Sequence, residues 1–187
     1  GISINRVTGL PSIKEIIDKE LIKTKDESTV QELESEKERE MKPPIRREGL
    51  RSGPNKNTSR KSYMDYRKIT NKASAQYQLQ QRDDVYTDKE GFRKIGDRYI
   101  VAVGTYYSSE VGTCIKVELS EGGIFEAIIG DIKDNSHTDS KNQQHLIDGS
   151  VIEFLVDTRN MDSLCKKMGN MSYATDVNLM GDIVSIE

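Results

Sequence analysis

Hydrophobic positions recur at short spacing in one stretch of the chain, residues 97–157. Four runs rich in Val, Ile, Tyr and Phe lie there between breaks that contain Gly, Ser or Asn, namely Tyr99–Val103, Thr113–Leu119, Ile124–Ile129 and Val151–Val156. Short apolar runs separated by turn residues predict the strands of a small β domain. Apolar and polar residues alternate within 113–119, which predicts a strand with one buried and one solvated face.

Turn and helix signals accompany these runs. Glu121-Gly122-Gly123, between the second and third runs, predicts a hairpin turn. Residues 160–167 predict a short helix that stops at Gly169, because glycine readily adopts the left-handed conformation that ends a helix. Ile183–Ile186 predicts a final strand that closes the sheet.

The first part of the chain has a helical pattern instead. After Pro11, apolar residues form one stripe at helical spacing: Ile13, Ile16, Ile17, Leu21 and Ile22. A second helix follows Ser28 and Thr29, each of which fits a capping box, and it ends before Pro43. The sequence therefore predicts a helical segment over 1–41 with an apolar face that docks on another surface.

Positive charge dominates the stretch between Lys42 and Arg82. Eleven basic residues face only two acidic ones, Glu48 and Asp65; the basic residues are Lys42, Arg46, Arg47, Arg51, Lys56, Arg60, Lys61, Arg67, Lys68, Lys72 and Arg82. Because apolar periodicity is almost absent, we predict an extended arm or linker over 42–96. Two interpretations remain open. The arm either binds an anionic partner, with Tyr63, Tyr66 and Tyr77 available for stacking, or becomes ordered by threading along neighbouring subunits.

Composition and charge limit the possible classes. With 34% hydrophobic and 32% charged residues, the chain is more polar than a fully packed globule, which has about 45% apolar residues. We therefore expect one compact domain over 97–187 after the N-terminal segments. A net charge of −3 argues against a dedicated nucleic-acid binder. No apolar run approaches the roughly 18 residues of a membrane span, and because the chain starts at Gly1 we expect a processed or trimmed piece.

The two cysteines give no framework of disulfides or zinc ligands. Cys114 falls inside a predicted strand, where we interpret it as a small buried apolar residue. A single bridge between Cys114 and Cys165 stays open as an alternative.

The order of motifs in the β region resembles a known family. IVAVGTYYSSEVGTCIKVEL, a Gly-containing turn, FEAIIGDIKD and DGSVIEFLV follow one another between Ile100 and Val156. This order resembles the double-psi β-barrel of the three-aspartate ("3D") and MltA-like lytic transglycosylases. Val111-Gly112-Thr113 stands at the family's Leu-Gly-Thr, Asp131 at its motif aspartate, and Gly149 with Ile152-Glu153 at its closing strand. The resemblance implies a mainly β fold with a small six-stranded double-psi-like barrel after the N-terminal helices and arm.

The resemblance also implies a role for Asp131. In that family the motif aspartate is the single general acid and base, and the sugar's own 6-hydroxyl closes an anhydro ring, whereas ordinary glycoside hydrolysis uses two carboxylates. Such an acid keeps its proton near neutral pH only if desolvation or like charges raise its pKa, and Asp134, Asp139 and Glu153 are candidates for the like charge. Supporting or substrate-binding roles fall to Thr113, Asp134, Asp148, Glu153, Tyr106, Tyr107 and His137. The family's Thr-Gly-Gly is replaced here by Ile132-Lys133-Asp134, and a polar insertion runs through His145.

A metal site is the alternative interpretation of the inserted segment. Carboxylate and imidazole groups are ordinary ligands of divalent cations. Five such residues occur close together in the sequence: Asp131, Asp134, His137, Asp139 and His145. Because their spacing matches no calcium or zinc motif, we predict neither a metal nor a cofactor.

Two functions remain as predictions. The domain also resembles C-terminal domains of tail or baseplate proteins from phages and prophages of Gram-positive bacteria. The first prediction is therefore a virion-associated tail or baseplate component whose barrel binds or cleaves peptidoglycan at the bacterial cell wall. The alternative is a catalytically silent plug or adaptor. In both cases residues 1–82 contact other virion proteins in a multi-subunit assembly, and neither nucleic acid nor a membrane is expected as a partner.

Overall fold

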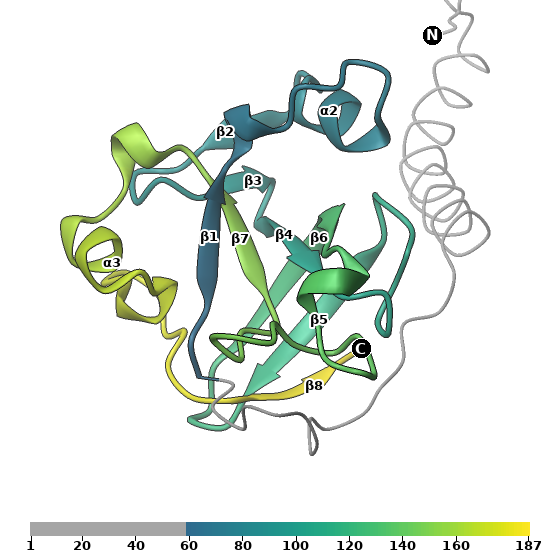
Figure 1. The fold of residues 1–187 in the computed structure, drawn as a ribbon. Coiled ribbons are helices and arrows are strands. Elements are labelled where there is room, and N and C mark those ends of the chain that lie inside the picture. The colour runs from purple at the N-terminus through teal and green to yellow at the C-terminus, as the bar shows by residue number, and fades with distance from the viewer. Residues whose placement is uncertain (1–58) are drawn as a thin grey trace, which may run out of the picture. The chain divides into compact units, whose positions relative to one another are not determined.

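A computed structural model describes residues 59–187, and this part of the chain is mainly β (Figure 1). It contains eight strands: β1 (Ser62–Asp65), β2 (Val85–Thr87), β3 (Arg93–Ile95), β4 (Arg98–Val103), β5 (Cys114–Leu119), β6 (Ile124–Ile132), β7 (Glu153–Val156) and β8 (Ile183–Ile186). The α-helices within 59–187 are α2 (Ala75–Gln80) and α3 (Ser163–Met168), and four short 3₁₀ turns accompany them. The predicted helices of 1–41 and the arm residues 42–58 lie outside the described residues.

The strands form one mixed sheet in the order β1-β7-β4-β6-β5-β8. β3 pairs with β4, and β2 pairs with β3, beside this path. Two neighbouring pairs are parallel, β1 with β7 and β4 with β6, and the other pairs are antiparallel. Figure 1 shows β1 and β7 running side by side. Parallel partners need a long connection, so strands far apart in the sequence meet in this sheet.

The strands that carry a clear apolar pattern occur where the sequence predicts them. β4 to β8 match the five predicted runs, with ends that differ by up to three residues. In β5 the apolar residues are buried and Lys116 and Glu118 are exposed, which confirms the predicted alternation. The turn at 121–123 joins β5 to β6, with Gly122 at a φ of 91° and the Leu119 N–H donating to the Gly123 carbonyl at 2.8 Å.

Residues 59–96, within the stretch predicted as an arm, contribute to the same sheet. β1, β2, β3 and α2 all come from this segment, and β1 pairs with β7 over its full length. These elements have three to six residues each, which is too short for an apolar period to stand out. The hydrogen bonds that order β1 come from a partner strand far along the chain rather than from local pattern.

The sheet buries apolar side chains on both faces. Along β4, Tyr99, Val101 and Val103 belong to the larger apolar cluster, and Ile100 and Ala102 belong to the smaller one. This alternation follows from the two-residue period of a strand. The smaller cluster also contains Leu79 of α2, Ile128 of β6 and Leu155 of β7, so α2 covers this second face.

The C-terminal part follows its local signals. α3 begins after Asp162, whose carboxylate accepts hydrogen bonds from two backbone N–H groups at 2.8 and 3.2 Å. It ends at Gly169, which has a φ of 61° and confirms the predicted stop. Both cysteines carry thiols, so the alternative of a bridge between them is wrong; Cys165 is buried and Cys114 is half-buried. Within residues 59–187 no helix is long and apolar enough to span a membrane.

Candidate functional site

Asp131 lies next to a β-bulge near the end of β6. Val101 of β4 pairs with Ile129, but Ala102 pairs with Asp131, so Gly130 has no partner of its own on β4. A Cβ on Gly130 would overlap with the Cγ2 methyl of Ile100, which explains why glycine occupies this position. Bulges of this kind redirect the side chains that follow them, and here the side chain concerned is Asp131.

The carboxyl group of Asp131 is half-buried beneath α2. Its Oδ1 atom accepts hydrogen bonds from the Ile132 N–H at 2.9 Å and from Nε2 of Gln76 at 3.4 Å. Desolvation raises the pKa of Asp131 above its ordinary value, while these two hydrogen bonds act in the opposite direction. Desolvation is thus the physical cause of the raised pKa, and the like charges of Asp134, Asp139 and Glu153 do not contribute to it.

A single row of the sheet brings Asp131 and Glu153 to the same face. Ala102 pairs with Asp131 on one side and with Glu153 on the other, and Glu153 in turn pairs with Ser62 of β1. Residues directly opposite one another on paired strands project from the same face. With neighbouring strands about 4.8 Å apart, the Cα atoms of Asp131 and Glu153 lie roughly 10 Å apart, and only the small side chain of Ala102 stands between them.

Lys133 adds a positive charge to this face. Its Nζ atom donates to the Ser150 carbonyl at 3.3 Å and lies 3.4 Å from the Ser150 Oγ atom. That Oγ atom is 3.1 Å from the Oγ atom of Ser62, which donates to Oε2 of Glu153 at 3.2 Å. Burial lowers the pKa of Lys133, whereas the charges of Glu153 and Asp148 act to raise it. A hydrogen-bonded network of polar side chains therefore lies beside the row of residues that contains Asp131.

The predicted supporting residues divide into those near Asp131 and those elsewhere. Glu153 shares its row, and Asp148 acts on Lys133 while accepting a 2.9 Å hydrogen bond from the Ser150 N–H. Thr113 is buried and donates to the Glu110 carbonyl at 2.8 Å, which is a structural contact. Tyr107 belongs to the larger apolar cluster, against which Tyr106 packs, so both tyrosines lie on the opposite face from Asp131.

The polar side chains of the inserted loop accept hydrogen bonds from the backbone of the same loop. Asp134 is exposed and accepts from the N–H of residue 136 at 2.8 Å, and Asp139 is buried and accepts from the N–H groups of residues 143 and 144 at 2.7 and 3.2 Å. His137 is exposed, and Nδ1 of His145 accepts from the N–H of residue 147 at 3.1 Å. Across 59–187 no three His, Cys, Asp or Glu side chains are arranged to hold a metal ion, so the structure does not support the metal alternative.

Sequence reasoning missed four residues of this site: Ser62, Gln76, Lys133 and Ser150. Lys133 carried a usable signal, because it follows Asp131 by two residues and a strand places such residues on one face. The other three depend on strand register and on the docking of α2, which leave no local pattern. No family model, curated protein or solved structure matches this chain.

Proposed function

We propose that residues 59–187 form a glycan-directed domain in which Asp131 is the general acid for cleavage of peptidoglycan, within a phage tail or baseplate component. The observation that carries the proposal is the half-buried Asp131 carboxyl, whose pKa is raised by desolvation. A general acid must hold its proton near neutral pH, and desolvation is an effective way to achieve this. The tail or baseplate setting is supported by the sequence resemblance.

A double-psi-like barrel is part of this proposal. An interlocked barrel of that type brings together strands that are far apart in the sequence. The parallel pairs β1/β7 and β4/β6, joined through the antiparallel pair β7/β4, support it. Within residues 59–187, β1 and β8 stand at the two ends of the strand order, so the closure of this sheet into a barrel is itself part of the proposal.

The reaction that we propose needs one proton donor. Asp131 gives its proton to the glycosidic oxygen as the bond from that oxygen to the sugar C1 atom breaks. The 6-hydroxyl of the same sugar then bonds to C1 and returns its proton to Asp131, which closes an anhydro ring and restores the acid. Gln76 orients the Asp131 carboxyl through the 3.4 Å hydrogen bond.

The test is digestion of purified peptidoglycan, with released fragments analysed by mass spectrometry for anhydro-sugar ends. We expect these ends from the wild-type protein and none from Asp131→Asn, which keeps the shape but cannot donate the proton. Glu126→Gln is the matched control, because Glu126 is an exposed carboxylate on the same strand, and it should retain activity. Circular dichroism checks that both variants fold. An unchanged rate in Asp131→Asn would remove this residue from the mechanism.

A silent plug or adaptor is the second candidate. Thr113, Tyr107 and Asp139 are buried within the fold, and the sequence lacks the glycines that would let a glycan approach the backbone after Asp131. The two glycine positions of the resembled family correspond to Lys133 and Asp134 here, and these observations together favour a scaffold without catalysis. This role predicts that wild-type protein releases no sugar ends yet assembles with other virion proteins. Digestion by a protein that remains monomeric would contradict it.

A further inference from the structure

Two turns of the same construction leave the sheet at one edge. β1 ends at Asp65, which is followed by Tyr66 and Arg67, and β7 is followed by Asp157, Thr158 and Arg159; a 3₁₀ turn begins in each case. Because β1 and β7 are parallel neighbours, both turns emerge at the same end of the pair. The two Asp-x-Arg sequences thus place two arginines close together.

Each aspartate fixes its arginine through three hydrogen bonds. Asp65 accepts from the backbone N–H, Nε and Nη2 of Arg67 at 2.8, 2.8 and 2.9 Å. Asp157 accepts from the same atoms of Arg159 at 3.0, 2.9 and 2.7 Å. The aspartate side chains are 8% and 6% exposed, but those of the arginines are 46% and 59% exposed. Each carboxylate accepts from two of the five N–H donors of its guanidinium group, which leaves three donors for a ligand.

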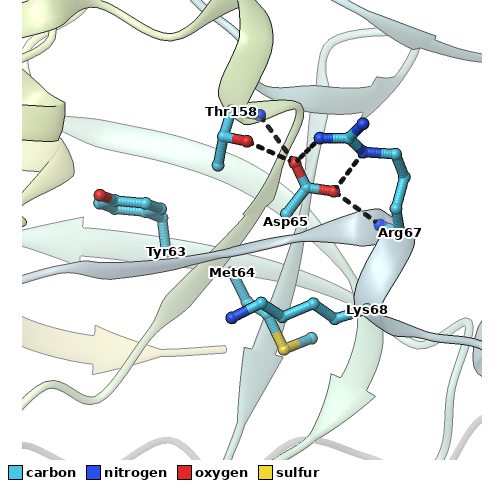
Figure 2. A pocket seen from close by; sticks show the side chains of 6 residues that line it. All are labelled: Tyr63, Met64, Asp65, Arg67, Lys68 and Thr158. Atoms are coloured by element: carbon cyan, nitrogen blue, oxygen red, sulfur yellow. Dashed lines mark hydrogen bonds and ion pairs between the residues drawn. The ribbon is translucent and has the colours of Figure 1, made fainter.

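A second set of contacts joins the two turns. Asp65 Oδ2 also accepts from the Thr158 N–H at 3.0 Å and from its hydroxyl at 2.7 Å, as Figure 2 shows. Asp65 raises the pKa of Arg67, and the charge of Arg159 acts in the opposite direction, which indicates that the two guanidinium groups are near neighbours. The arginines are therefore held in place before any ligand arrives, which reduces the entropy lost on binding.

Two shallow hollows lie beside Arg67, and tyrosine side chains line part of each. One, of about 380 Å³, is lined by Tyr63, Asp65, Arg67 and Lys68, and Figure 2 shows Arg67 and Lys68 on opposite sides of β1. The other, of about 410 Å³, is lined by Tyr66, Arg67, Lys72 and Tyr77. Arg67 lines both hollows. A ligand that crosses Arg67 would thus meet an aromatic ring on each side.

Local charge at this edge is positive although the chain is acidic overall. The acidic residues at this edge are Asp65 and Asp157, and the five basic residues outnumber them by three; they are Arg67, Lys68, Lys72, Arg93 and Arg159. Arg93 contributes through its guanidinium, which lies 3.9 Å from the centre of the Tyr66 ring. The net charge of −3 argued against nucleic acid only as an average over the chain. Binding depends on the local field, which here favours anions.

We propose that this edge, centred on Arg67 and Arg159, binds single-stranded nucleic acid. Guanidinium donors suit the oxygens of a backbone phosphate, and tyrosine rings in the flanking hollows suit unpaired bases. The open, shallow hollows fit a polymer that lies across the edge better than a small enclosed metabolite. Carboxylate-rich peptides would match the charge but would make no use of the three tyrosines. This site is separate from Asp131 and stands whether or not the domain cleaves glycans.

Fluorescence anisotropy with a labelled 12-nucleotide oligo-dT at low salt tests the proposal. We expect Arg67→Gln and Arg159→Gln each to weaken binding at least fivefold and to reduce the slope of log affinity against log salt by about one. Arg82→Gln is the matched control, because Arg82 is fixed by Asp84 with the same two side-chain contacts at 2.9 and 2.7 Å. This control should leave the affinity unchanged.

Two further probes distinguish stacking of the bases from electrostatic attraction of any anionic polymer. An abasic 12-mer of the same charge should bind at least fivefold more weakly than oligo-dT, because stacking on the tyrosines is lost. Polyglutamate of equal charge should compete poorly. The proposal is overturned if oligo-dT fails to bind, if the two arginine variants bind like wild type, or if the abasic strand or polyglutamate binds as tightly as oligo-dT.

Discussion

Lys61 makes the stability of this domain depend on pH in an unusual direction. It lies immediately before β1 and is fully buried. Its Nζ atom donates to the Ser59 carbonyl at 2.8 Å, the Ser172 hydroxyl at 3.0 Å and the Gly181 carbonyl at 2.7 Å. Burial lowers the pKa of Lys61 from 10.5 to about 8, although two nearby carboxylates act to raise it. In the unfolded chain this lysine is in water and keeps the ordinary pKa of 10.5, so folding itself lowers the pKa.

The direction of this pH dependence is set by which state, folded or unfolded, binds the proton at Lys61. Between pH 8 and 10.5 the unfolded chain binds a proton at Lys61 that the folded chain has released, so the free energy of unfolding rises with pH. Since one pKa unit corresponds to about 1.4 kcal/mol, the full lowering of the Lys61 pKa corresponds to about 3 kcal/mol. Only part of this free energy is gained by pH 9, because most of the change occurs between pH 8 and pH 10.5. Between pH 7 and pH 9 the expected gain in the free energy of unfolding is about 1 kcal/mol.

Urea denaturation at pH 7, 8 and 9 measures this gain. Lys61→Met fills similar volume without a titrating group and should lack the increase, whereas Lys116→Met removes an exposed lysine and should keep it. The Cys165 thiol, whose pKa burial raises to about 11, acts in the opposite direction above pH 9. It is present in every variant, so the difference between wild type and Lys61→Met isolates the lysine. Equal pH dependence in these two proteins would refute the assignment to Lys61.

Two further predictions concern Gly130, which lies next to Asp131, and Asp65, which fixes Arg67. Gly130→Ala should lower the free energy of unfolding by about 1–3 kcal/mol, because the new methyl group overlaps with Ile100; Gly96→Asn, in open space at a φ of 57°, should change it by less than about 0.5 kcal/mol. Equal denaturation midpoints for these variants would contradict the close approach. Hydrogen bonds from Arg67 hold the pKa of Asp65 well below its usual range, so this carboxylate stabilises the fold above about pH 4 and loses that effect as the pH falls further. Asp65→Asn should therefore be less stable than wild type by about 2 kcal/mol at pH 7, with the gap narrowing by pH 3 in urea denaturation, and a gap independent of pH would argue against this role.

Local pattern was sufficient for most of the sheet. The apolar runs of β4, β5, β6 and β7 alternate or stay apolar over four or more residues, which is long enough for the two-residue period to be visible. Gly169 marked the end of α3 for an equally local reason, since it must adopt a left-handed conformation. The same logic failed for β1, because SYMD has no apolar alternation and its order depends on β7.

The candidate site was only partly visible for a related reason. Asp131 stood out because it stands at the motif aspartate of the resembled family, shortly after the apolar run that ends at Ile129. That Glu153 shares its row depends on the register of β4 with two different strands and on the bulge at Gly130. The resemblance grouped Tyr106 and Tyr107 with Asp131, but the turn that follows β4 packs both tyrosines against the larger apolar cluster, on the other side of the sheet. Register and face are set by the whole sheet rather than by any single segment.

The pairing of β1 with β7 also has a consequence for synthesis of the chain. Ser62 and Glu153, which meet in that pair, are 91 residues apart. At about 5–20 residues per second, a ribosome needs roughly 5–20 s to make the intervening length. During that interval β1 has emerged without β7. Lys61 and Asp65, which are buried in the folded domain, are then in water. Nascent chains of this protein must therefore postpone the pairing of β1 until β7 has been made, which makes folding slow and dependent on a distant part of the sequence.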